Sequence, residues 1–167
     1  MLAASVLVAP VAAADEPARA PESVLRLAGC WNGAGEVMGT PVAVSVDARP
    51  TALGAMLALD ANSVATADPT DRYAAHLVFG GSKDAGQVTG FWSDSFGGGM
   101  TATGSGTDQP GGFDIGYRYS DAEYVNRWRL SGDDLAWTIV ARDSGGEEAP
   151  FAGYLLTRVT CRDASAG

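Results

Sequence analysis

The two cysteines of this chain, Cys30 and Cys161, lie near the two ends of its strand-rich region. In an oxidising compartment two such thiols usually form a disulfide, which needs Cα atoms within about 7 Å of each other. The first and last strands would then be neighbours, and a sheet whose first and last strands meet is a closed barrel. Two unpaired buried thiols remain the alternative.

The sequence between the cysteines consists of short apolar and alternating segments separated by Gly, Asp, Asn and Ser. In the clearest segment, residues 111–121, the side chains of Phe113, Ile115, Tyr117 and Tyr119 share one face. Helical periodicity is nearly absent. We therefore predict an all-β, closed up-and-down antiparallel barrel of about nine or ten strands, with a β-sandwich as the runner-up fold.

The N-terminal segment predicts export. Residues 1–14 are uncharged, apolar and rich in small residues, which fits a signal peptide cut after Ala14, although no Lys or Arg precedes the apolar run. A buried N-terminal helix is the alternative. We predict a flexible leader at 15–23, a single barrel domain at 24–163 that opens with a short helix or turn, and a disordered tail at 164–167. Export would make the protein periplasmic or secreted.

The charge of the chain restricts its partners. The formal net charge is −9, with only 11 basic residues. A surface of this sign repels nucleic-acid phosphates and anionic membrane surfaces. The first apolar stretch is also too short to span a bilayer. We expect neither nucleic-acid binding nor stable membrane insertion.

Short motifs resemble one superfamily of barrels. Residues 29–35, GCWNGAG, resemble the G-x-W-x-G-x-G opening of DUF1579-type bacterial domains in the lipocalin-like (calycin) superfamily and, more distantly, of nitrobindin-type haem barrels. Residues 78–106 are also similar to the DUF1579 pattern of Gly-aromatic-Trp and Asp-Ser before a glycine turn. In calycins the first-strand Trp closes one barrel end and a last-strand Arg packs across it. The resemblance implies that Trp31 and Arg158 form this structural seam.

His76 is the only histidine of the chain. Nitrobindin-type barrels hold haem iron through a histidine near the C-terminal end, where this sequence has none, so we do not expect haem at His76. It alternates out of phase with Tyr73, Leu77 and Phe79, and we expect it to face solvent or to make a local hydrogen bond. One histidine and no cysteine cluster give no zinc ligand set. We predict no metal and no cofactor.

A catalytic set is not evident in the sequence. The chain has no G-x-S-x-G motif. A nucleophilic Ser93 would need His76 as its base, since no other imidazole exists. An enzyme is therefore the less favoured class.

Aromatic side chains are the remaining candidates for ligand contacts. They either fill the core or line a cavity. The candidates are Trp92, Phe113, Tyr117, Trp128 and Trp137. If Trp128 points inward, Arg127 and Arg129 point outward, whereas an inward arginine beside a tyrosine would indicate an anionic ligand.

These observations together predict an exported calycin-like barrel that binds a small, partly apolar molecule without catalysis. One alternative is a solid barrel that serves in the envelope as an interaction or structural protein. A haem-dependent enzyme is the less favoured alternative. The sequence identifies neither the ligand nor a protein partner.

Overall fold

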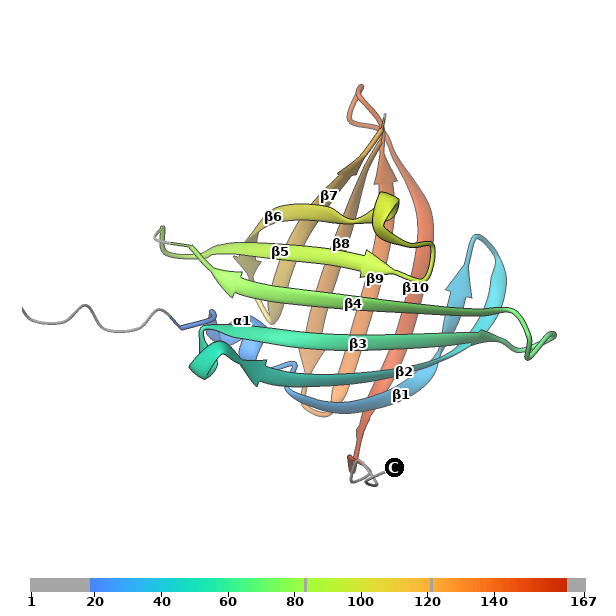
Figure 1. Ribbon diagram of the computed structural model, residues 1–167, viewed down its shortest axis with the longest axis horizontal. Coiled ribbons are helices and arrows are strands. Elements are labelled where there is room, and N and C mark those ends of the chain that lie inside the picture. Colours follow the sequence, from blue (N-terminus) through green and yellow to red (C-terminus); the bar gives the residue numbers. More distant parts are fainter. Residues whose placement is uncertain (1–18, 83, 121, 162–167) are drawn as a thin grey trace, which may run out of the picture.

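The computed structural model describes residues 19–82, 84–120 and 122–161. The predicted signal peptide, the first residues of the leader and the C-terminal tail lie outside this range. One short helix precedes ten strands in the described part (Figure 1). The elements are α1 (Glu22–Leu25), β1 (Gly29–Val37), β2 (Thr40–Thr51), η1 (Ala52–Gly54), β3 (Met56–Ala65), β4 (Arg72–Gly81), β5 (Gln87–Asp94), η2 (Gly98–Met100), β6 (Ala102–Gln109), β7 (Gly112–Tyr119), β8 (Ala122–Ser131), β9 (Asp134–Arg142) and β10 (Glu148–Val159).

The sheet closes on itself. Each strand pairs antiparallel with the next, and β1 pairs antiparallel with β10, so the ten strands form a closed barrel. In Figure 1 strands β2–β5 lie across the front, and β7–β10 run behind them in a steeply different direction. The predicted all-β, up-and-down barrel is confirmed, and the sandwich alternative is wrong because the first and last strands share a ladder.

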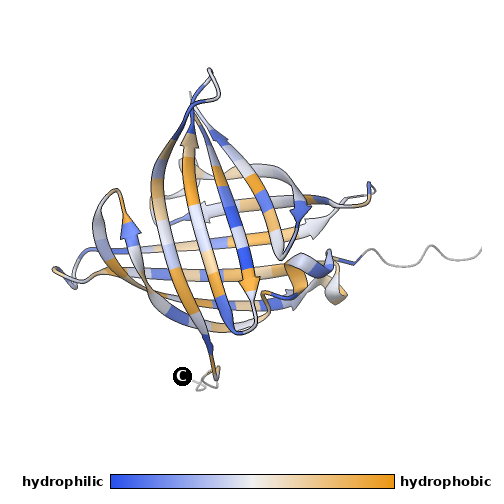
Figure 2. Ribbon diagram, turned by 180° about the vertical axis from the view of Figure 1, so that it is seen from behind, coloured by the Kyte–Doolittle hydropathy of each residue, from blue (hydrophilic) through white to orange (hydrophobic). Residues whose placement is uncertain are grey.

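Alternation along the strands separates the interior from the surface. In β2 the side chains of Val42, Val44, Val46 and Ala48 are buried, and the residues between them are exposed. Figure 2 shows the same alternation of apolar and polar residues on other strands. This two-residue period is expected for a sheet with one face buried and the other exposed to solvent.

Glycines let β1 and β10 approach closely at the seam. A Cβ atom at Gly33 would lie 2.0 Å from the carbonyl oxygen of Leu155, and one at Gly35 would lie 2.0 Å from that of Gly153. No side chain fits at these distances. The glycines of the G-x-W-x-G-x-G stretch therefore allow the close strand contact that closes the barrel.

The end of the barrel at which β1 begins is filled. Val24 of α1 and Leu27 just after it are fully buried, and so is Trp31 of β1. The Trp31 indole Nε1 donates a hydrogen bond to the Leu27 carbonyl oxygen at 2.8 Å. The predicted short helix thus covers this end. No helix among the described residues is long and apolar enough to cross a membrane.

Residues 19–23, which we assigned to a flexible leader, pack against the barrel. Ala20 is buried, and its backbone N–H donates to the Gly54 carbonyl oxygen at 3.1 Å. The Ser23 hydroxyl donates to the Asp108 carboxylate. The packed domain therefore begins before residue 24, because the apolar surface of the barrel end extends to Ala20.

Two contacts fasten the β1–β10 seam. Cys30 and Cys161 form a disulfide with a Cα–Cα distance of 5.1 Å. The guanidinium carbon of Arg158 lies 4.0 Å from the centroid of the Trp31 ring, and Arg158 Nη1 donates to the Ala28 carbonyl oxygen at 2.7 Å. The predicted proximity of the cysteines is confirmed. The Arg158–Trp31 contact lies where the resemblance implied it.

Candidate functional site

The end of the barrel opposite α1 is hollow. A cavity of about 480 Å³ opens there. The odd-numbered strands end at this rim and the even-numbered strands begin at it, as the antiparallel meander dictates. Val37 at the end of β1 and Val42 near the start of β2 contribute to its wall. The cavity is thus built by nine of the ten strands, all but β6, rather than by one loop.

Aromatic side chains dominate the wall of the cavity. The chain has five tyrosines, and all of them line it. The aromatic lining residues are Tyr73, Trp92, Phe96, Tyr117, Tyr119, Tyr124, Trp137, Phe151 and Tyr154. Such a wall offers large apolar faces together with hydroxyl and indole polar groups, which suits a small, partly apolar ligand.

The predicted ligand contacts divide between the cavity and the packed core. Trp92, Tyr117 and Trp137 line the cavity. Phe113 and Trp128 are fully buried and are not among the residues that line it. Trp128 stacks on Trp137 with ring centroids 4.3 Å apart, and on Phe113 at 6.0 Å. This stack forms the solid floor of the cavity.

Asp94, the last residue of β5, gathers polar groups at the cavity wall. Its Oδ2 accepts hydrogen bonds from the Tyr73 hydroxyl at 3.0 Å and from the Trp92 indole at 3.1 Å. Its Oδ1 accepts one from the Phe96 backbone N–H at 2.9 Å. None of the ion pairs found within the described ranges includes Asp94. The carboxylate is thus held by neutral donors.

Four of the cavity tyrosines, Tyr73, Tyr117, Tyr119 and Tyr154, are neutral over the physiological pH range. Burial raises the pKa of Tyr154 to about 12. Burial, and secondly the Asp94 charge, raise the pKa of Tyr119 to about 12. Burial also raises the pKa values of Tyr73 and Tyr117. The hydroxyls of Tyr117 and Tyr119 are buried without a hydrogen-bond partner among the described residues.

Two polar residues of the site were not predicted from the sequence. Asn126 is 1% exposed, and its Oδ1 accepts a hydrogen bond from the Trp137 indole at 2.9 Å. Asn126 shares the face of Trp128 by strand alternation, and Asp94 shares the face of Trp92. The two-residue alternation of the strands therefore indicated that Asn126 and Asp94 both point into the barrel.

The charge of the lining is negative. Asp71 and Asp94 are its charged members, and it contains no Lys, Arg or His. Arg127 and Arg129 form ion pairs on the outer face of the barrel, as their alternation with Trp128 predicts. The inward arginine that would indicate an anionic ligand does not occur in this lining.

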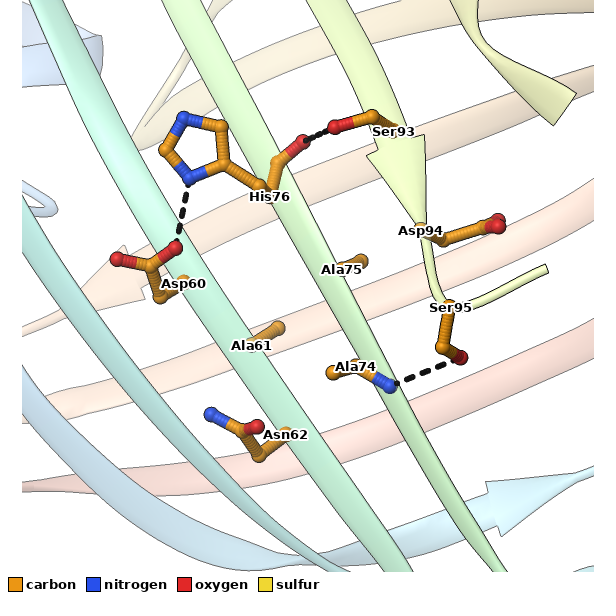
Figure 3. A pocket seen from close by; sticks show the side chains of 9 residues that line it. All are labelled: Asp60, Ala61, Asn62, Ala74, Ala75, His76, Ser93, Asp94 and Ser95. Atoms are coloured by element: carbon orange, nitrogen blue, oxygen red, sulfur yellow. Dashed lines mark hydrogen bonds and ion pairs between the residues drawn. The ribbon is translucent and has the colours of Figure 1, made fainter. Parts of the chain in front are cut away.

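A second, shallow hollow lies on the outer face of β3–β5 (Figure 3). Asp60, His76 and Ser93 lie side by side there in register. His76 Nδ1 lies 2.6 Å from Asp60 Oδ1, but the Ser93 hydroxyl donates to the His76 backbone oxygen at 3.3 Å, not to the imidazole. This arrangement holds no hydrogen-bonded pair of nucleophile and base.

The Asp60 carboxylate is part of an exposed ion-pair network. Arg49 Nη2 lies 3.1 Å from Asp60 Oδ2, on the side away from the cavity. Partial burial raises the pKa of Asp60, but the hydrogen bonds and charges of His76 and Arg49 outweigh it and hold the pKa below its ordinary value. Because these ion pairs are exposed to solvent, they contribute at most modestly to the stability of the fold.

The residues of the cavity do not fit haem held by a histidine. His76 lies on the outer face of β4 with its side chain 45% exposed, and the cavity lining contains neither His nor Cys. In the part of the chain that the structure describes, no three His, Cys, Asp or Glu side chains gather as metal ligands would.

Comparison with known proteins supports the fold. No family model and no curated protein matches this chain. The crystal structure of Rv2717c from M. tuberculosis matches with a TM-score of 0.63 and 16% identity, over 84% of this chain and 99% of that one. This chain is therefore a closed antiparallel ten-stranded β-barrel that shares its fold, at low sequence identity, with that protein.

Proposed function

We propose that this protein binds a small, partly apolar molecule in the open end of its barrel and catalyses no reaction on it. The observation that carries the proposal is the 480 Å³ cavity with its aromatic wall. Pockets for small molecules are concave and mostly apolar, with a few converging polar groups. Asp94 and Asn126 are such groups here.

The alternative, a solid barrel that acts only through its surface, fits this interior less well. A barrel without a ligand is expected to fill its interior with side chains, as the α1 end does. The enzyme alternative is also less well supported, because the row of Asp60, His76 and Ser93 lacks the hydrogen bond that activates a nucleophile.

We also propose that the protein acts outside the cytoplasm, in the periplasm or after secretion. The disulfide between Cys30 and Cys161 supports this placement, since such bonds persist in oxidising compartments. The apolar stretch at residues 1–14 supports it independently. The calycin-like ancestry suggested by residues 29–35 remains part of this proposal.

Binding of the neutral apolar fluorophore N-phenyl-1-naphthylamine tests the proposal. The expected result is a saturable increase in its emission with the purified protein. Val42→Trp adds a large ring to the cavity wall, and Ala43→Trp adds the same ring to the outer face of the same strand. We expect V42W to abolish the increase and A43W to retain it.

Circular dichroism of both variants shows whether the barrel is intact. The proposal is wrong if folded V42W binds the fluorophore as the parent protein does, or if no apolar probe binds the parent protein. Either result would favour the alternative of a barrel that acts only through its surface. Native mass spectrometry of the purified protein adds a second readout, because a retained small molecule increases the mass.

A further inference from the structure

We infer that the ligand carries a positive charge, an amine or a quaternary ammonium group on an apolar body, and that Asp94 holds this group among the rings of Tyr73, Trp92 and Tyr119. The inference rests on the proposed function. It adds the chemical class of the ligand and the place of its charge.

The hydrogen bonds of Asp94 leave its charge uncompensated. A carboxylate offers about four acceptor positions, and three are used here by Tyr73, Trp92 and the Phe96 backbone. These three donors are neutral, and no ion pair within residues 19–82, 84–120 and 122–161 neutralises Asp94. A cation in the cavity would supply the missing charge at a site that aromatic walls partly shield from water.

The aromatic rings of the cavity wall also favour a cation. Aromatic faces carry negative potential, and an ammonium group within about 6 Å of a ring centroid is attracted to it. Phe96 packs on Tyr73 with ring centroids 5.6 Å apart, and Trp92 packs on Tyr117 at 5.4 Å. Groups of aromatic rings are how proteins recognise quaternary ammonium compounds.

Two tyrosine hydroxyls behind the cavity wall lack a hydrogen-bond partner among the described residues. Tyr117 is fully buried, and its hydroxyl has no hydrogen-bond partner among the described residues. The Tyr119 hydroxyl is in the same situation, close enough to Asp94 for that charge to raise its pKa. A buried hydroxyl without a partner costs free energy. Neither oxygen is exposed to the cavity, and the Tyr117 hydroxyl lies over Gly90 beside Phe79, so the inference rests on Asp94 and the aromatic wall rather than on these hydroxyls.

The wider charge distribution has the same sign. Asp71 lies at the rim of the cavity, the lining has no basic residue, and the chain carries a formal net charge of −9. This field attracts cations and repels anions on the approach to the cavity.

Binding of three matched small molecules tests the inference. Benzyltrimethylammonium carries the charge, neopentylbenzene has the same shape without it, and phenylacetate carries the opposite charge. Calorimetry or quenching of tryptophan fluorescence gives each affinity. We expect the cation to bind about tenfold or more tightly than its neutral isostere, consistent with cation–π and ion-pair contributions, and phenylacetate to bind most weakly.

Variants assign the charge effect to one carboxylate. Asp94→Asn keeps the size and the acceptor oxygen but removes the charge, so we expect it to lower affinity for the cation about tenfold and for neopentylbenzene less than about twofold. Asp60→Asn makes the same change on the outer face and should alter neither affinity. Tyr119→Leu removes a ring near Asp94 and should also lower the affinity for the cation more than the affinity for neopentylbenzene.

The outcomes separate this inference from the proposed function. If neopentylbenzene binds the parent protein as tightly as the cation, the charge inference is wrong and the proposed function stands. If the two charged molecules fail to bind up to about 10 mM, and neopentylbenzene and the naphthylamine probe fail to bind up to their solubility limits, both are wrong. The comparison of cation and isostere on the parent protein decides the question even if Asp94→Asn does not fold.

Discussion

Arg158 lies across the indole face of Trp31, with its guanidinium carbon 4.0 Å from the ring centroid. The two residues are direct partners in the β1–β10 ladder. Arg158 also donates to the backbone oxygens of Ala28 and Arg26. One side chain thus ties together the first strand, the last strand and the segment after α1.

Removing this guanidinium should destabilise the barrel. Arg158→Ala loses a cation–π contact and two hydrogen bonds from a charged donor, so we expect a loss of about 2–4 kcal/mol in the free energy of unfolding. Arg118→Ala, at an exposed position of β7, should change it by less than about 0.5 kcal/mol. Urea denaturation followed by circular dichroism measures the free energy of unfolding of both variants. Equal values for the two variants would show that the contact between Arg158 and Trp31 does not stabilise the barrel.

The disulfide should contribute strongly to stability because it closes a long loop. Cys30 and Cys161 are 131 residues apart in sequence. Cross-links of this length are expected to add about 2–5 kcal/mol by restricting the unfolded chain. The double variant with serine at both positions should unfold at a lower denaturant concentration, by about that amount. A non-reducing mass equal to that of the dithiol would contradict the bond itself.

Adding one methyl group at the seam should be far more damaging than adding it nearby. Gly33→Ala would place a Cβ 2.0 Å from a backbone oxygen of β10, whereas Gly153→Ala on β10 meets nothing within 4 Å. We expect Gly33→Ala to lower the free energy of unfolding by about 2–4 kcal/mol or to prevent folding. Gly153→Ala should be neutral or slightly stabilising. Thermal melts of the two variants check this, and indistinguishable melting temperatures would refute the close contact.

High pH should reveal the enclosed tyrosines. The pKa values of Tyr119 and Tyr154 rise from 10.0 to about 12, and those of Tyr73 and Tyr117 also rise. The unfolded chain releases these protons first, so their stabilising effect is complete below pH 10.0 and is lost as the pH rises towards 12. Ultraviolet titration should show delayed tyrosinate formation in the native protein compared with the protein in guanidinium chloride. Coincident curves would mean that water reaches the cavity wall freely.

The fold was largely predictable because its determinants are local. Strand alternation in residues 111–121 reports which side chains face inward, and the positions of Cys30 and Cys161 report that the chain ends meet. The depth of an inward residue along the barrel axis is different. It depends on how the ten strands are tilted and staggered, which alternation does not encode.

This limit explains why the candidate site was predicted only in part. Phe113 and Tyr117 share one face of β7, yet Tyr117 lines the cavity and Phe113 lies in the floor. The role of Asp94 depends on the hydrogen bonds that Tyr73 and Trp92 donate to it. Tyr73 and Asp94 lie on neighbouring strands, and their contact depends on the pairing register.

The four tryptophans provide the most direct test of where a ligand binds, because they sample three levels of the barrel. Trp92 and Trp137 line the cavity, Trp128 lies in the floor, and Trp31 lies at the closed end. Indole N–H resonances in a ¹H–¹⁵N spectrum should be followed during titration with the naphthylamine probe. We predict that the Trp92 and Trp137 signals shift most and that the Trp31 signal stays in place. Saturable binding that shifts Trp31 and leaves Trp92 unchanged would contradict a ligand site at the open end.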